Sequence, residues 1–275
     1  LFRSQIDALV DQLEQLIRTM IAEGRPPELC VSHYWDGGVV TARARSRVWP
    51  SGADAAAGVA CPPHTWIPHS LASVKRRNTA AERWGALNLD ERERYERSVL
   101  ETVDAVGTTS HTIETAVRRD YHYAGKTTDL PPCVDPDRFF PGNGDVNAET
   151  ARLLAQHSSR TATEIASMRI MTEISRTDQT KRKDILLEVI AALVPSYPEL
   201  FLAVTIDDRQ QDVANELHRT IDARNIGNHV AVLGNVASAV PALLRSTYVY
   251  VTPSEMEGFG MSLQEAAACG VPAVS

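Results

Sequence analysis

Residues 253–275, with the sequence PSEMEGFGMSLQEAAACGVPAVS, hold the strongest indication of fold in this chain. Residues 248–251, just before them, form a short apolar run that is typical of a buried strand. Residues 253–260 are typical of a glycine-bearing turn, and 262–268 of an alanine-rich helix that ends at Gly270. A strand followed by a tight turn and a helix is the repeating unit of parallel α/β sheets.

The same alternation of strand and helix runs through most of the second half of the chain. Predicted strands lie at 169–174, 200–206 and 230–233, and predicted helices at 184–194, 212–223 and 240–245. This alternation predicts an α/β fold with a parallel, doubly wound sheet. Ligands bind such sheets at the carboxyl ends of the strands, so we expect candidate site residues in the loops that follow the strands.

The first half of the chain mixes helices and strands less regularly. Predicted helices are 1–23, 39–48, 90–103 and 111–118, and predicted strands are 29–32 and 105–108, with a loop at 33–38. A stretch with glycine, asparagine and proline, from residue 131 to about residue 162, shows little strand pattern. It marks the expected boundary between two domains, 1–145 and 146–275.

The composition is that of a globular protein large enough for two domains, because the 275 residues are 43% hydrophobic and 23% charged. A formal net charge of −7 argues against nucleic acid as the main partner, since binding to phosphate backbones needs a basic face. No apolar run approaches the roughly 20 residues that cross a bilayer. Leu1 is not a start methionine and Ser275 follows a strand-like run, so both ends look cut and a targeting segment beyond them stays open.

The four cysteines are widely separated and form no Cys-x-x-Cys pair. We therefore expect free thiols in a reducing compartment and a cytoplasmic location. Cys61, His64 and His69 form one partial metal pattern. Prolines and an apolar run surround these residues, and no fourth ligand has the spacing of a zinc family, so we predict no metal.

Glu257 and Glu265 lie on either side of a Gly-Phe-Gly sequence. Gly258 and Gly260 let the backbone approach a ligand and leave amide groups free at a helix N-terminus, which favours anions. Carboxylates that accept hydrogen bonds from sugar hydroxyls, beside amides that meet a diphosphate, are the layout expected for a sugar nucleotide. The alternative is a solvated loop residue at 257 and a surface helix residue at 265. The glycines and the preceding strand favour the ligand site.

A basic turn follows the first predicted strand of the second half and leads directly into a helix, because residues 175–184 read SRTDQTKRKD. Arg176 can bind phosphate through two hydrogen bonds, Lys181 acts as a point charge, and the helix N-terminus adds a favourable dipole. The turn is therefore interpreted as a diphosphate clamp, with a solvated basic turn as the alternative. This turn and 253–260 both follow strands of one parallel sheet, so they can face a single pocket.

The first half of the chain holds a second group of candidate residues. His33 and Asp36 belong to the sequence HYWDGG, which is either a ligand loop or an aromatic-capped turn. His69 precedes a basic run that contains Lys75, and Arg92 is a further cation on a predicted helix. Each has a structural alternative, since a lone histidine is often a packed structural residue and basic runs are often surface.

Together these segments resemble the retaining nucleotide-sugar glycosyltransferases of the GT-B fold, and among them the sucrose-phosphate synthases. The resemblance runs in collinear order through nearly the whole chain. It is carried by HYWDGG at 33–38, His69-Ser-Leu with Lys75, Arg92 with Glu96, Thr108-Thr-Ser110, Pro131-Pro132, Ser175-Arg-Thr-Asp178 with Lys181, and EGFG at 257–260 with Glu265. The last of these is highly specific for the superfamily. The histidine-to-lysine spacing is shared with the transferases that glycosylate inositol phosphate.

The resemblance implies two Rossmann-like, doubly wound domains that face a cleft, the first incomplete at its start and the second at its end. It implies an enzyme that moves a hexose, with retention of anomeric configuration, from a nucleotide diphosphate sugar to a phosphorylated small acceptor. UDP-glucose is the expected donor and is a substrate, so neither a cofactor nor a metal ion is expected.

The resemblance also implies a role for each candidate residue. Arg176 and Lys181 would neutralise the diphosphate leaving group, Glu257 would hold the donor hexose, and His69 would lie near the reacting sugar. Further donor contacts are expected from Gly258, Phe259, Gly260, Met261 and Glu265, the last at the ribose hydroxyls. The acceptor side is expected to hold His33, Asp36, Lys75 and Arg92, with Lys75 and Arg92 at the phosphate of an acceptor such as fructose 6-phosphate.

The sequence departs from the family pattern at its amino terminus and in two of the motifs. The glycine-rich loop near the family's amino terminus has no counterpart, Trp35 and Gly37 replace smaller or different residues, and Lys183-Asp184 replaces a Lys-Asn junction. Two alternatives stay open: a sugar-nucleotide isomerase or hydrolase on the same scaffold, and a non-catalytic fragment that binds nucleotide sugars. A dinucleotide-dependent dehydrogenase is disfavoured, since no Gly-x-Gly-x-x-Gly follows a predicted strand.

Overall fold

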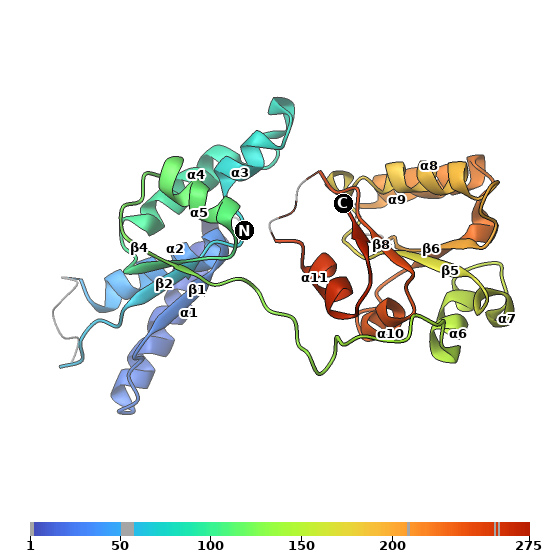
Figure 1. Cartoon of the computed structure of the whole chain (residues 1–275). Helices are drawn as coiled ribbons and strands as arrows, with labels where there is room; N and C mark the ends of the chain where they lie inside the picture. Colours follow the sequence, from blue (N-terminus) through green and yellow to red (C-terminus); the bar gives the residue numbers. More distant parts are fainter. Residues whose placement is uncertain (1–2, 51–57, 208–209, 256, 258) are drawn as a thin grey trace. The chain divides into compact units, whose positions relative to one another are not determined.

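The computed structural model describes residues 3–50, 58–207, 210–255, 257 and 259–275. It divides into two compact units, Leu1–Pro132 and Cys133–Ser275, which run from blue to green and from green to red in Figure 1. Each unit contains its own parallel sheet. The predicted α/β class is confirmed for both.

Unit 1 is built on a four-stranded parallel sheet with the strand order β1-β2-β3-β4. The strands are β1 (Cys30–His33), β2 (His64–Ile67), β3 (Ala105–Thr108) and β4 (Lys126–Asp129). The helices are α1 (Arg3–Ala22), α2 (Tyr34–Val48), α3 (Ala72–Arg77), α4 (Leu89–Leu100) and α5 (His111–Arg119), with a 3-10 turn η1 (Ala81–Arg83). Because β1 and β2 pair in parallel, their carboxyl ends lie side by side.

The core of unit 1 is organised around Trp66 in β2, whose side chain is fully buried. Its indole nitrogen donates a 2.7 Å hydrogen bond to the main-chain oxygen of Tyr34. Gly38 packs against the same ring, because a Cβ atom at this position would lie 2.7 Å from the indole nitrogen. Close packing therefore explains the second glycine of the HYWDGG sequence.

The start of unit 1 confirms one predicted element and corrects another. Helix α1 matches the amphipathic helix predicted at 1–23, of which residues 1 and 2 lie outside the described part, and it buries Ile6 and Val10. The loop predicted at 33–38 is wrong, since α2 begins directly after β1. Tyr34 has a φ of 60°, in the left-handed region, and this single residue makes the turn from strand to helix.

Unit 2 is built on a five-stranded parallel sheet with the order β7-β6-β5-β8-β9. The strands are β5 (Arg169–Glu173), β6 (Leu200–Thr205), β7 (Val230–Leu233), β8 (Val249–Val251) and β9 (Ala273–Val274). The helices are α6 (Ala148–Gln156), α7 (Ala162–Ile165), α8 (Lys183–Leu193), α9 (Gln211–Ala223), α10 (Val240–Arg245) and α11 (Met261–Ala268), with 3-10 turns η2 (Gln179–Lys181) and η4 (Gly227–His229). The pairing of β5 with β8 brings the two loops predicted to bind ligand to neighbouring strand ends.

Strand β6 shows why this sheet is covered on both faces. Alternate residues of a strand point to opposite faces, and Phe201 and Ala203 join one core cluster while Leu202 and Val204 join the other. Helices α6, α10 and α11 contribute to the first cluster and α8 and α9 to the second. Figure 1 shows these two sets on opposite sides of the sheet, so the doubly wound arrangement predicted for the second half is confirmed.

The segment between the two sheets belongs with unit 2. Phe139 is 7% exposed and packs in the first core cluster of that unit. Residues 133–145 therefore belong to unit 2, whereas the expected boundary lies after residue 145. Apolar side chains in a segment without strand or helix pattern do not show from the sequence which core they join.

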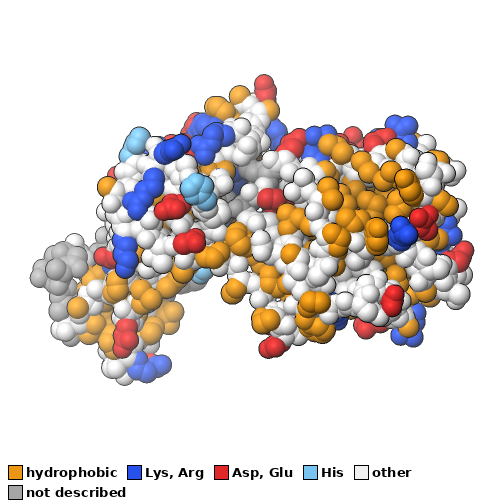
Figure 2. Space-filling view, in the orientation of Figure 1, with side chains coloured by type: hydrophobic (Ala, Val, Ile, Leu, Met, Phe, Trp, Pro, Cys, Tyr) orange, Lys and Arg blue, Asp and Glu red, His pale blue; other side chains and the backbone are white. Residues whose placement is uncertain are grey.

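Charged side chains of both signs reach the surface of both units on the face shown in Figure 2. Within the ranges that the structure covers, no helix combines the length and apolar character needed to cross a membrane.

Candidate functional site

The two loops predicted to share a pocket meet through an ion pair in unit 2. The Nζ atom of Lys181 lies 2.5 Å from Oε1 of Glu257, and these side chains are 11% and 31% exposed. Lys181 ends η2 in the loop after β5, and Glu257 lies in the loop after β8. A cation and a carboxylate from two different loops are therefore brought together at the carboxyl edge of the sheet.

Further contacts join the same two loops. The amide of Glu255 donates a 2.9 Å hydrogen bond to the main-chain oxygen of Thr180. The guanidinium of Arg182 lies 2.6 Å from Oε1 of Glu255 and 3.0 Å from Oδ2 of Asp184, and these carboxylates raise the pKa of Arg182. Neither Arg182 nor Glu255 was among the predicted site residues. The sequence pointed to them only through their nearness to the predicted residues Lys181 and Glu257.

Arg176 lies on the same loop and points into solvent. Its side chain is 74% exposed, and its guanidinium lies 3.8 Å from Oδ2 of Asp178. Asp178 also caps the following turn, because it accepts a 2.9 Å hydrogen bond from the amide of Thr180. The loop thus carries three cations, of which Arg176 is exposed, Arg182 is partly exposed and Lys181 is largely buried. This arrangement is suited to binding an anion that arrives from solvent.

The start of α11 forms the second part of the predicted donor site. Gly260 has a φ of 78° and precedes Met261, the first helical residue, while Phe259 is half-buried. Gly258 lies outside the described residues. Burial raises the pKa of Glu265 on the same helix, and the positive charge of Arg138 partly opposes that shift. Arg138 was not among the predicted site residues, because it lies in a segment without strand or helix pattern.

The candidate residues of unit 1 contain a pair of histidines. Nδ1 of His33 lies 2.8 Å from Nε2 of His69, and the two rings are stacked with centroids 5.1 Å apart. The ring of Tyr34 lies against His69 at 4.7 Å between centroids. Burial lowers the pKa of His69, and the neighbouring His33 lowers it further. The strand pairing of β1 with β2 brings these residues, far apart in the sequence, into contact.

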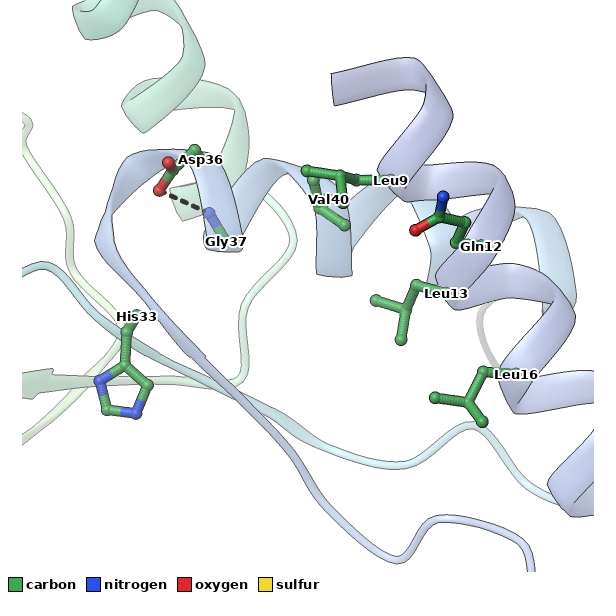
Figure 3. Close-up of a pocket in the computed structure, with 8 residues that line it drawn as sticks. All are labelled: Leu9, Gln12, Leu13, Leu16, His33, Asp36, Gly37 and Val40. Carbon is green, nitrogen blue, oxygen red and sulfur yellow. Dashed lines mark hydrogen bonds between the residues drawn. The ribbon is translucent and has the colours of Figure 1, made fainter. Parts of the chain in front are cut away.

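Asp36 lines a pocket between α1 and α2 that His33 also lines. Its carboxylate accepts a 2.9 Å hydrogen bond from the amide of Gly37, which Figure 3 shows. The pocket has a volume of about 460 Å³. Leu9, Gln12, Leu13, Leu16, His33, Asp36, Gly37 and Val40 line it. Its walls are mainly apolar. His33 and Asp36 lie where β1 meets α2, and Gln12 adds a polar side chain from α1.

Arg92 has a structural role in unit 1. It is 9% exposed, its Nε lies 2.7 Å from Oε1 of Glu96, and its Nη2 donates to the main-chain oxygen of Ser70 at 2.6 Å. Glu96 is fully buried and accepts hydrogen bonds from the amide of Ala72 and the hydroxyl of Tyr121. Arg92 therefore fixes the residue next to His69. Lys75, the other predicted phosphate ligand, is half-buried on α3.

The partial zinc pattern separates in space. The Nε2 atom of His64 lies 2.6 Å from the hydroxyl of Ser32 inside the sheet, whereas His69 contacts His33. Cys61 donates through its thiol to the main-chain oxygen of Pro62. In the part of the chain that the structure describes, no three or more His, Cys, Asp and Glu side chains are grouped as a metal site.

The buried His64 should make unit 1 sensitive to acid. Its side chain is fully buried, and burial lowers its pKa from 6.5 to about 4. The unfolded chain therefore takes up a proton that the folded chain rejects between pH 6.5 and 4, so stability falls as the pH falls through this window. We expect the free energy of unfolding to drop by about 3 kcal/mol across it.

Urea unfolding followed by tryptophan fluorescence would measure this drop, because all four tryptophans are in unit 1. His64→Gln should lose most of the pH dependence, and His111→Gln, at an exposed position, should keep it. An equal pH dependence in His64→Gln and the parent would contradict the assignment to His64.

Comparison with known proteins shows which families and structures this chain is similar to. Residues 159–275 match the family model described as glycosyl transferases group 1. The chain is 27% identical over 257 residues to mannosylfructose-phosphate synthase from Agrobacterium fabrum, covering 88% of this chain and 52% of that protein. It therefore spans about half the length of this curated relative.

Two solved structures have the same fold. The sucrose-phosphate synthase from Thermosynechococcus elongatus superposes with a TM-score of 0.74 at 22% identity, over 99% of this chain and 61% of that one. HepE from Anabaena, in complex with UDP-glucose, superposes with a TM-score of 0.65 at 20% identity, over 95% of this chain and 64% of that one. Residues 159–275 are thus similar to the group 1 glycosyl transferases, and the chain has, over nearly its whole length, the fold of the GT-B glycosyltransferases.

Proposed function

We propose that this protein is a retaining hexosyltransferase that moves a hexose from a nucleotide diphosphate sugar to a phosphorylated small acceptor. The contact between Lys181 and Glu257 carries the proposal, because it joins the two loops at the carboxyl edge of one sheet. Cleavage of the bond between sugar and diphosphate builds negative charge on phosphate oxygens, which fixed cations stabilise. The carboxylate beside the cation is placed to accept hydrogen bonds from sugar hydroxyls.

UDP-glucose is the proposed donor. HepE, which shares the fold, binds UDP-glucose in its solved structure. Arg176 and Lys181 would supply the positive charge at the diphosphate, so the proposed reaction needs neither a cofactor nor a metal ion. Glu265 would bind the ribose hydroxyls, and the amides near Gly260 would bind the donor at the start of α11.

We also propose a cytoplasmic location, in keeping with four free cysteines.

The proposed acceptor carries a phosphate group. The products that name mannosylfructose-phosphate synthase and sucrose-phosphate synthase are both sugar phosphates. In unit 1, Lys75 on α3 lies six residues after His69, and it is the cation we assign to the acceptor phosphate. Arg92 would act indirectly, through its hydrogen bonds to Ser70.

A test of the acceptor class is the variant Lys75→Ala. We expect kcat/KM for a phosphorylated acceptor, such as fructose 6-phosphate, to fall about 10- to 100-fold, because a charge-assisted contact is lost. Activity on the unphosphorylated sugar should stay within a few-fold of the parent. Release of nucleotide diphosphate by the full-length protein is the measurement. Lys126→Ala, at an exposed position at the amino end of β4, is the matched control.

Three results of this assay would contradict the proposal. An equal loss of kcat/KM on the phosphorylated and the unphosphorylated acceptor would show that Lys75 does not bind the acceptor phosphate. Donor turnover at the same rate without any acceptor would indicate a hydrolase or isomerase. Nucleotide-sugar binding without turnover, in a screen of donors and acceptors, would indicate a binding protein.

A further inference from the structure

A second ion pair lies inside unit 2, beneath the basic loop. Nζ of Lys183 lies 3.1 Å from Oε2 of Glu173, and these side chains are 1% and 0% exposed. Glu173 is the last residue of β5 and Lys183 is the first residue of α8. The pair therefore joins the two ends of the loop 174–182, which carries both Arg176 and Lys181.

The lysine also binds the end of the neighbouring strand. Nζ of Lys183 donates to the main-chain oxygen of Ser175 at 3.0 Å, to the hydroxyl of Thr205 at 3.1 Å, and to the main-chain oxygen of Thr205. The Thr205 hydroxyl in turn donates to the main-chain oxygen of Ser175 at 2.7 Å and accepts from its amide at 3.0 Å. One ammonium group thus connects β5, β6 and α8 at the base of the loop.

General stability is a poor explanation for this pair. Moving two charges from water into a protein interior is costly, and well-packed apolar residues of similar size are often as stabilising or more so. Burial raises the pKa of Glu173 and lowers the pKa of Lys183, and the attraction between the two opposes both shifts. Hydrogen bonds from a buried ammonium do, however, fix the geometry of the main chain, which apolar side chains cannot do.

The loop above the pair is held at other points along its length. The hydroxyl of Thr177 accepts a 2.7 Å hydrogen bond from the amide of Asp207, after β6. Lys181 reaches Glu257 in the loop after β8. Among the cations of this loop, Arg176 is the most exposed, at 74%. A loop fixed at both ends and along its length presents its cations in one arrangement before any ligand arrives.

We propose that Lys183 and Glu173 are positioning residues, which hold the loop 174–182 in the shape that receives a nucleoside diphosphate. The inference rests on the proposed function for the identity of the ligand, and on the contacts of Lys183 for the ordering of the loop. Neither residue touches the ligand. Both act through the main chain that carries Arg176 and Lys181.

The test uses the double variant Glu173→Leu/Lys183→Met, because removing one partner alone would leave an unpaired buried charge and could prevent folding. We expect thermal unfolding, followed by circular dichroism, to shift by only a few degrees. Amide hydrogen exchange in peptides covering 174–182 should become about tenfold faster or more, since the loop opens locally. The Kd for UDP should rise about tenfold or more.

The matched control is Glu188→Gln/Arg224→Gln, which removes an exposed ion pair of 3.0 Å between α8 and the residue that follows α9. It should change neither loop exchange nor UDP binding. Parent-like exchange in 174–182 together with parent-like UDP affinity in the double variant would overturn the proposal. So would a double variant that fails to fold, because the pair would then serve stability. Faster loop exchange in a chain whose parent binds no UDP would support the positioning role and count against the proposed function.

Discussion

Replacing Lys181 by alanine is expected to lower kcat for hexose transfer about 100- to 1000-fold, the range found when a group that stabilises developing negative charge is removed. The KM for the donor should change much less, because the cation is most valuable when charge builds on the departing diphosphate. The side chain of Lys181 is 11% exposed and is held in place by Glu257, so its charge meets the ligand with little screening by water. Nucleotide diphosphate release by the full-length enzyme, at saturating donor and acceptor, is the measurement.

Two further variants sharpen this expectation. Arg224→Ala removes an exposed arginine that pairs with Glu188 at 3.0 Å in the same unit, and it should leave kcat within about twofold. Lys181→Arg keeps the charge and should retain more activity than the alanine variant. A Lys181→Ala enzyme with unchanged kcat and a raised KM would show that the residue binds donor and transition state equally, and the leaving-group role would be wrong.

The run Lys181-Arg182-Lys183 shows how far a sequence can predict such a site. The position of the run after a buried strand correctly predicted a basic loop at the carboxyl edge of the sheet. The three side chains form ion pairs with three different carboxylates. Lys181 pairs with Glu257, Arg182 with Glu255 and Lys183 with the buried Glu173. Neighbouring residues in a turn follow no fixed period, so the sequence does not show which cation is buried.

The closing stretch of the chain was the most predictable part. The predicted strand at 248–251 and helix at 262–268 correspond to β8 (Val249–Val251) and α11 (Met261–Ala268). The apolar strand and the glycine before the helix are strong local signals. Strand β4 (Lys126–Asp129), in contrast, was not predicted. It is a polar edge strand and lacks the apolar alternation by which strands are recognised.

Arg92 shows a different limit of prediction from sequence, which concerns the burial of charged residues on a helix. The family resemblance assigned it to the acceptor phosphate, as a further cation on a predicted helix. In α4 the buried face consists of Leu89, Arg92, Glu96 and Val99, at the three- and four-residue spacing of one helix face. The apolar members alone are too few to mark that face, so the sequence does not show that Arg92 and Glu96 are buried. Its i and i+4 spacing was the signal that the two side chains could bind each other.

The buried pair of Arg92 and Glu96 leads to a prediction of a large effect on stability. We expect Arg92→Met to lower the free energy of unfolding of unit 1 by about 3–5 kcal/mol, because it leaves the carboxylate of Glu96 buried without its cation. Burial already raises the pKa of Glu96, with Arg92 opposing that shift, so the variant should also favour a protonated Glu96. Urea unfolding followed by tryptophan fluorescence measures the loss, since every tryptophan of the chain lies in unit 1.

Arg94→Met is the matched control, because Arg94 is exposed on the same helix and should change stability by less than about 0.5 kcal/mol. The double variant Arg92→Met/Glu96→Met removes both charges and should be more stable than Arg92→Met alone. An Arg92→Met protein with parent-like unfolding but a specific loss of activity on phosphorylated acceptors would instead place Arg92 at the acceptor phosphate. The unfolding curve therefore separates a residue that builds the site from one that contacts its ligand.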